Sequence, residues 1–126
     1  MRIALYVALG ILWVPKATAG DVSFADDVLP VLNRHCVICH MPGSEQGDLS
    51  LYPDAHSSMV GVPSSQSPLS LVVPGSVENS YLFRKLVGTQ EAAGGTGASM
   101  PFQSPLLEAS QIELVRRWIE RGAQND

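Results

Sequence analysis

The sequence predicts a small all-α domain in which helices are joined by long loops. Two segments show the helical repeat of apolar residues, one at about residues 23–36 and the other at about 108–121. Between them, glycine, proline and serine are frequent in the stretches 42–48, 61–70 and 88–99. Loops of this length are uncommon in so short a domain unless something organises them. We therefore expect the helices and loops to wrap around a bound group.

The first residues of the chain are typical of a secretory signal peptide. Arg2 supplies a positive charge, an apolar run covers residues 3–14, and residues 17–19 have the small-x-small form of a cleavage site. The apolar run is too short to cross a bilayer as a helix, and an uncleaved N-terminal anchor is the alternative. We expect residues 1–19 to be removed on export and residues 20–126 to form one periplasmic domain with no membrane span.

The charge of the expected mature domain argues against nucleic acid as a partner. Cleavage removes two of the eight Lys and Arg residues, Arg2 and Lys16, and none of the twelve Asp and Glu residues, which leaves a formal net charge of −6. Nucleic-acid binding depends on cationic side chains at the phosphates. The acidic residues are scattered along the chain, which is typical of a solvated surface.

The N-terminal helix is expected to begin after Ser23, a residue type that often caps helices. Asp26 and Asp27 lie in its first turn, where negative charge is favourable. Apolar residues then recur at helical spacing over 24–32. Pro30 lies inside this pattern, and its missing N–H predicts a kink or a late start of the regular helix.

Three more helical segments follow. The C-terminal helix is expected over 108–121, with Trp118 on its apolar face and Gly122 as its stop signal. Its apolar face should pack on the N-terminal helix, with Trp118 in that contact. A shorter helix is expected at about 79–86 and a single turn at 54–60.

Residues 36–40, Cys-Val-Ile-Cys-His, are the most specific motif in the chain. This spacing is the attachment sequence of a c-type haem, in which both sulfurs form thioethers with the porphyrin and the imidazole binds the iron. We therefore expect one haem c, covalently bound through Cys36 and Cys39, with His40 as the first axial ligand of the iron. Export agrees with this prediction, because it takes the chain out of the reducing cytosol.

A Cys-x-x-Cys pair also occurs in zinc sites and in thioredoxin-like redox disulfides. A structural zinc site has four ligands, but Cys36 and Cys39 are the only cysteines, and His35 and His56 do not form the second pair. A thioredoxin-like motif follows a strand and begins a helix, whereas here the helical pattern precedes the motif. Haem attachment is the favoured interpretation.

Met100 is the best candidate for the second axial ligand. It follows the glycine-rich stretch 94–99 and precedes Pro101. Glycine lets a loop approach a flat group closely, and proline fixes the direction in which the chain leaves. A thioether ligand raises the reduction potential of the iron.

Other residues are weaker candidates for contact with the haem. Met41 is tied to the side of His40, and Met59 lies in an apolar stretch typical of core packing. His56 is the second candidate for the ligand, although a solvent-facing position on a polar turn is favoured. The basic residues nearest in sequence for pairing with haem propionates, each more typical of a solvated surface, are Arg34, Arg84 and Lys85.

A series of short motifs covers nearly all of the expected mature domain. In chain order they are Phe24-x-x-x-Val28-x-Pro30-Val31-Leu32, Cys36-x-x-Cys39-His40, Leu49-x-Leu51, Val73-Pro74-Gly75 with Asn79-Ser80-x-Leu82, Met100-Pro101, and Ile112-x-x-Val115-x-x-Trp118-Ile119-x-x-Gly122-Ala123. The series resembles the planctomycete-type cytochrome c domain of the class I cytochrome c superfamily. The resemblance implies an all-α class I cytochrome c fold around one haem, with His40 and Met100 as axial ligands and one haem edge near solvent.

These observations predict a monohaem c-type cytochrome that carries one electron between redox partner proteins and is not an enzyme. With both axial positions filled, the iron has no vacant site for a small-molecule substrate. The second ring N–H of His40 is expected to donate to a backbone carbonyl. Two alternatives stay open. One is an open-site haem protein, either a gas sensor or a peroxidase-like enzyme, and the other is a haem subunit docked on a larger redox enzyme.

Overall fold

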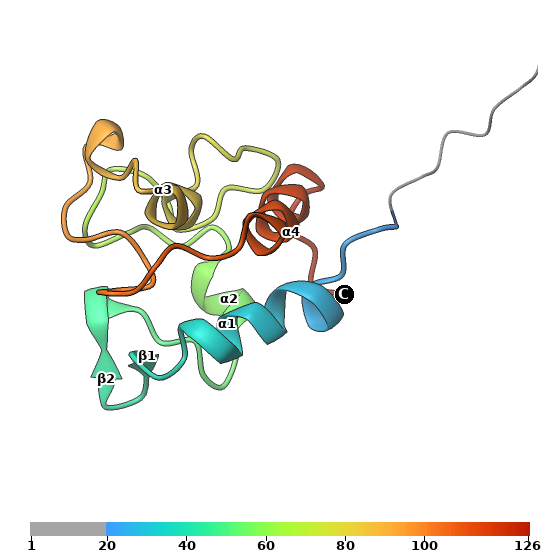
Figure 1. Cartoon of the computed structure of the whole chain (residues 1–126), viewed down its shortest axis with the longest axis horizontal. Helices are drawn as coiled ribbons and strands as arrows, with labels where there is room; N and C mark the ends of the chain where they lie inside the picture. The colour runs from blue at the N-terminus through green and yellow to red at the C-terminus, as the bar shows by residue number, and fades with distance from the viewer. Residues whose placement is uncertain (1–19) are drawn as a thin grey trace, which may run out of the picture.

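A computed structural model describes residues 20–126 of the chain, and the expected signal peptide lies outside the described residues (Figure 1). None of the helices in 20–126 is long and apolar enough to span a membrane. In chain order the elements are a π-helical turn Phe24–Val28, α1 Leu29–His35, β1 His40–Met41, β2 Ser44–Glu45, a 3₁₀ turn Gln46–Asp48, α2 Ala55–Met59, α3 Tyr81–Val87, a 3₁₀ turn Glu91–Ala93, and α4 Ala109–Glu120.

The N-terminal helix begins where the sequence predicts. The side chain of Ser23 accepts a hydrogen bond of 3.2 Å from the backbone N–H of Asp26. The first turn, Phe24–Val28, is π-helical, and the regular helix α1 starts only at Leu29, with Pro30 in its first turn. Proline is tolerated at that position because its missing N–H has no partner there in any case. The predicted late start of the regular helix is confirmed.

The N-terminal helix packs against α4, as predicted (Figure 1). The ring centroids of Phe24 and Trp118 lie 5.1 Å apart. Trp118 is buried, and its indole Nε1 donates a 2.8 Å hydrogen bond to the carbonyl of Gln124. At the start of α4, Glu108 and Gln111 form a reciprocal capping box. The predicted role of Trp118 in the helix contact is confirmed.

The two shorter helices also lie within a residue or two of their predicted positions. α3 occupies Tyr81–Val87, and Gly88 ends it at a φ of 73°, the left-handed conformation typical of a helix end. α2 occupies Ala55–Met59, and the side chain of its N-cap Asp54 accepts a 3.0 Å hydrogen bond from the backbone N–H of Ser57. A capping residue thus marks the start of α2 and the end of α3.

The prediction contained no strands, whereas the structure has a short hairpin directly after α1. β1 pairs with β2 in antiparallel orientation, with His40 opposite Glu45. Gly43 makes the turn at a φ of 88°, and its N–H donates a 2.9 Å hydrogen bond to Oε1 of Glu45. Strands of two residues are too short to show the apolar alternation by which strands are predicted. The hairpin matters because it carries His40.

The core lies between the N-terminal helix, α2, α3 and α4. Met59 is fully buried there, as its apolar surroundings in the sequence predict. Its other large members are Phe24, Val28, Leu32, Leu51, Val72, Leu86, Val115, Trp118 and Ile119.

Candidate functional site

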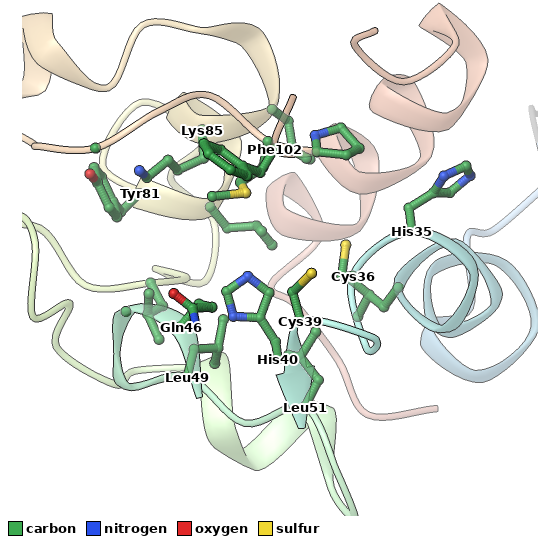
Figure 2. A pocket seen from close by; sticks show the side chains of 18 of the residues that line it. His35, Cys36, Cys39, His40, Gln46, Leu49, Leu51, Tyr81, Lys85 and Phe102 are labelled. Carbon is green, nitrogen blue, oxygen red and sulfur yellow. The ribbon is translucent and has the colours of Figure 1, made fainter. Parts of the chain in front are cut away.

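A cavity of about 620 Å³ opens between α1, the hairpin, α3 and the loop that precedes α4 (Figure 2). Its volume lies in the range of about 300–1,000 Å³ that is typical of ligand and cofactor sites. Most of its wall is apolar and comes from segments far apart in the chain. The apolar residues of the interior are Leu32, Leu49, Leu51, Met59, Leu71, Leu82 and Leu86.

All four site residues predicted from the sequence line this one cavity. Cys36, Cys39 and His40 lie on the side of α1 and the hairpin, and Met100 comes from the loop that follows α3. The motif and Met100 are far apart in sequence, so the fold itself brings them together. The two thiols, the imidazole and the thioether therefore surround the same space.

Backbone hydrogen bonds hold His40 in place, and its ring is directed into the cavity. Its N–H lies 3.1 Å from the carbonyls of Cys36 and Val37, and its own carbonyl accepts a 2.7 Å hydrogen bond from the N–H of Leu51. The ring extends into the cavity between Cys39 and Gln46 (Figure 2).

The Nδ1 atom of His40 is buried, and no described residue forms a hydrogen bond with it. The expected bond from this ring to a backbone carbonyl is therefore absent from residues 20–126. A buried polar atom without a partner costs about 1–3 kcal/mol. Such atoms are rare in native proteins and need an explanation, of which a functional role is one.

The two cysteines are free thiols in different surroundings. Cys36 ends α1 and is half-buried, whereas Cys39 is exposed. Burial, together with the neighbouring charge of Cys39, raises the pKa of Cys36 to about 11. A redox nucleophile of the thioredoxin kind has a lowered thiol pKa, so the shift at Cys36 is in the opposite direction. Within residues 20–126, no group of three or more His, Cys, Asp or Glu side chains is placed to hold a metal ion.

The loop that carries Met100 is fastened to α3. Lys85 is only 6% exposed, and its Nζ donates hydrogen bonds to the carbonyls of Thr96 at 2.9 Å and Ala98 at 2.8 Å. The hydroxyl of Tyr81 donates to the same Thr96 carbonyl at 2.8 Å. The N–H of Met100 donates to the carbonyl of Lys85 at 2.9 Å. The prediction of a solvated surface role for Lys85 is wrong, because its ammonium group reaches inward to loop carbonyls.

Glycines in this loop allow its close approach to α3. A Cβ at Gly95 would lie 2.3 Å from Cε2 of Tyr81, a distance that side chains do not tolerate. Gly97 has a φ of +78°, and a Cβ there would lie 3.0 Å from Nζ of Lys85. The sequence suggested that glycine serves the approach of Met100 to a flat group, whereas these two glycines contact the helix that holds the loop.

His56 and Met41 lie outside the cavity wall, whereas Met59 and Lys85 are part of it. His56 packs edge-on against Phe24 with ring centroids 5.2 Å apart, and its Nε2 lies 2.7 Å from the carbonyl of Ala123. Its expected solvent-facing position is wrong, because the ring is half-buried against Phe24 and bonded to the carbonyl of Ala123. Met41 is 40% exposed and does not line the cavity.

The two arginines considered for propionate pairing do not line the main cavity either. Arg84 donates a 2.9 Å hydrogen bond from Nε to the backbone carbonyl of Glu78. Arg34 is exposed and lines a smaller neighbouring cavity of about 390 Å³ together with His35. A surface role fits both arginines better than contact with a group in the main cavity.

Sequence reasoning missed the apolar residues at the mouth of the cavity. Ile38 is 76% exposed and Phe102 is 57% exposed, yet both line the cavity. Ile38 lies between the two cysteines, so its exposure follows from the conformation of the motif. No signal in the sequence points to Phe102, because exposure of a loop residue depends on the tertiary fold.

Comparisons of the chain with protein-family models, with curated proteins and with solved structures found no match.

Proposed function

We propose that this chain is a monohaem c-type cytochrome that carries single electrons in the periplasm. The observation that supports this proposal most strongly is that Cys36, Cys39, His40 and Met100 all line one largely apolar cavity of about 620 Å³. We also propose that the chain is a domain of the planctomycete-type cytochrome c family, which its motifs resemble.

The donor groups of the cavity fit a covalently bound haem. The thiols of Cys36 and Cys39 can each add across one vinyl group, with sulfur bonding to one carbon and the thiol hydrogen passing to the other, so that no oxidant is needed. His40 supplies an imidazole whose ring extends into the cavity, and Met100 supplies a thioether. When bound, the haem supplies one-electron chemistry at its iron, and ligation by histidine and methionine raises its potential.

The remaining residues of the cavity fit an electron carrier better than an enzyme. Leucines on several sides exclude water from the interior and give it a low dielectric constant. Hydrogen bonds from α3 hold the loop of Met100 at the cavity. Met100 and His40 would together hold the iron there and would leave it no position for a substrate. Ile38 and Phe102 give the mouth an apolar rim on which a redox partner can settle.

The proposed ligation is tested with protein exported by a bacterial host that matures c-type cytochromes. We expect the absorption spectrum to change reversibly between an oxidised and a reduced form, in a redox titration that fits the transfer of one electron. We also expect that the ferrous protein does not bind carbon monoxide at neutral pH. Rapid binding of carbon monoxide would contradict stable ligation by methionine and favour the open-site alternative.

Met100→Ala identifies the ligand. This variant is expected to keep its covalent haem, to have a lower reduction potential, and to bind carbon monoxide. Met41→Ala is the matched control, because Met41 is exposed and does not line the cavity. Its spectrum and potential should equal those of the wild type. A Met100→Ala protein with an unchanged spectrum would remove Met100 from the proposed ligand set.

A further inference from the structure

We propose that Lys85 is a positioning residue that keeps Met100 on the iron by fastening the loop 96–100 to α3. This inference rests on the proposed function, because it assigns a role to Lys85 in the ligation by Met100. Figure 2 shows the side chains of Lys85 and Tyr81 on the α3 side of the cavity, opposite His40.

Lys85 contacts the loop at three alternate residues. Its Nζ donates to the carbonyls of Thr96 and Ala98 at 2.9 and 2.8 Å, and its own carbonyl accepts a 2.9 Å bond from the N–H of Met100. The carbonyl between them, at Gly97, accepts a 3.2 Å bond from Nε2 of Gln90. The backbone on the N-terminal side of Met100 is thus held at successive carbonyls by side chains that lie outside the loop.

The burial of Lys85 is explained by these bonds. Its side chain is 6% exposed, and none of the ion pairs within residues 20–126 includes it. Burying an amine without a carboxylate is costly unless its protons are donated to acceptors. The loop carbonyls are the acceptors, and the ring of Tyr81, whose centroid lies 5.4 Å from Nζ, adds a further favourable contact.

The composition of the loop makes such a fastening necessary. A glycine-rich segment has more conformational freedom than any other and loses more entropy when it is fixed. Gly95 and Gly97 leave no space for a side chain between the loop and α3, since a Cβ would lie 2.3 Å from Tyr81 at the first position and 3.0 Å from Lys85 at the second. Tyr81 and Lys85 therefore occupy the space beside the glycines, and both donate hydrogen bonds to carbonyls of the loop.

Loss of the Lys85 side-chain bonds should let an external ligand displace Met100 more easily. Two hydrogen bonds of ordinary strength correspond together to a change of about tenfold or more in the equilibrium between the attached and detached loop. Exogenous imidazole competes with Met100 for ferric iron, so its affinity reports on that equilibrium.

The experiment compares imidazole binding to the ferric haem-loaded protein in four variants. Lys85→Leu removes the donors and brings no sulfur to the cavity, and we expect it to bind imidazole about tenfold more tightly, or more, than the wild type. Lys85→Arg keeps the donors and should restore an affinity close to that of the wild type. Arg84→Met, on the same helix but bonded only to the Glu78 carbonyl, is the matched control and should leave the affinity unchanged. Met100→Ala should bind imidazole most tightly.

A double variant separates positioning from general stability. In the Met100→Ala background, Lys85→Leu should have no further effect on imidazole affinity, because no sulfur is left to position. A merely structural role would lower the melting temperature in both backgrounds without this dependence on Met100. The melting temperature and the affinity are therefore measured in parallel.

The outcomes distinguish the two proposals. If Met100→Ala binds imidazole no better than the wild type, ligation by Met100 fails, and the role of Lys85 fails with it. If Met100→Ala binds more tightly but Lys85→Leu does not, only the inference about Lys85 is overturned. Should Lys85→Leu not accumulate, Lys85→Gln takes its place, since it stays polar but is too short to reach both carbonyls. Wild-type affinity in that variant overturns the inference equally.

Discussion

Ser80→Ala tests how the structure holds α3 in place. Ser80 is fully buried directly before α3, and its hydroxyl accepts a 2.9 Å hydrogen bond from the N–H of Val73 and donates one of 2.8 Å to the carbonyl of Ser76. Alanine fits the same space but leaves both backbone groups without this partner. At about 1 kcal/mol for each lost bond, and more where water cannot replace it, we expect a loss of about 2 kcal/mol in the free energy of unfolding.

For a domain of this size, such a loss corresponds to a decrease of roughly 8 °C in the melting temperature. The assay is thermal unfolding followed by far-ultraviolet circular dichroism. Ser104→Ala is the matched control, because Ser104 is exposed and bonds only weakly, at 3.4 Å, to the carbonyl of Phe102. Its melting temperature should stay close to that of the wild type. Equal melting temperatures for Ser80→Ala and Ser104→Ala would refute the reasoning.

Two further changes test other parts of the fold. Gly95→Ala should lower the free energy of unfolding by about 2 kcal/mol, since its Cβ would overlap the buried ring of Tyr81, and an unchanged denaturant midpoint would show that the loop does not approach α3 so closely. Hydrogen bonds from Ser57 hold the pKa of Asp54 below its usual value, so the stability that this carboxylate contributes is present above its ordinary pKa of about 3.9 and is lost as the pH falls below it. Asp54→Asn should therefore lose less stability on acidification, and a denaturant midpoint with the same pH dependence as the wild type would contradict this.

The helices could be predicted because their signals are local. Ser23 and Glu108 precede helix starts, Gly88 and Gly122 follow helix ends, and the apolar repeats between them need only the sequence of each segment. The packing of the two terminal helices followed from the match of their apolar faces. The hairpin at His40 gave no such signal, because it is shorter than the repeat that would reveal it.

The sequence pointed to the residues proposed as the reactive groups of the site, but not to the residues that hold them in place. Cys36, Cys39, His40 and Met100 share one cavity, and they were predicted because the proposed attachment and ligation of a haem would need those residue types at those places. The role of Lys85 was missed because its acceptors are backbone carbonyls, which no residue type marks. On a short helix, a lysine is usually at the surface, and only the tertiary fold shows which lysine is buried.

The environment of His56 was missed for a related reason. Its neighbours Phe24, Trp118 and Ala123 come from both ends of the described chain. A local sequence window shows a polar turn and nothing of these contacts. Residues whose surroundings are assembled from distant segments are those for which sequence reasoning was least informative.

The central claim is that one haem is covalently bound through Cys36 and Cys39, and intact mass spectrometry of the exported protein tests it most directly. We predict the mass of residues 20–126 plus that of one complete haem, because addition of the thiols to the vinyl groups loses no atoms, together with the absence of free thiols. The double variant Cys36→Ser/Cys39→Ser should lack the added mass. A colourless wild-type protein with the mass of the polypeptide alone and two reactive thiols would contradict the claim.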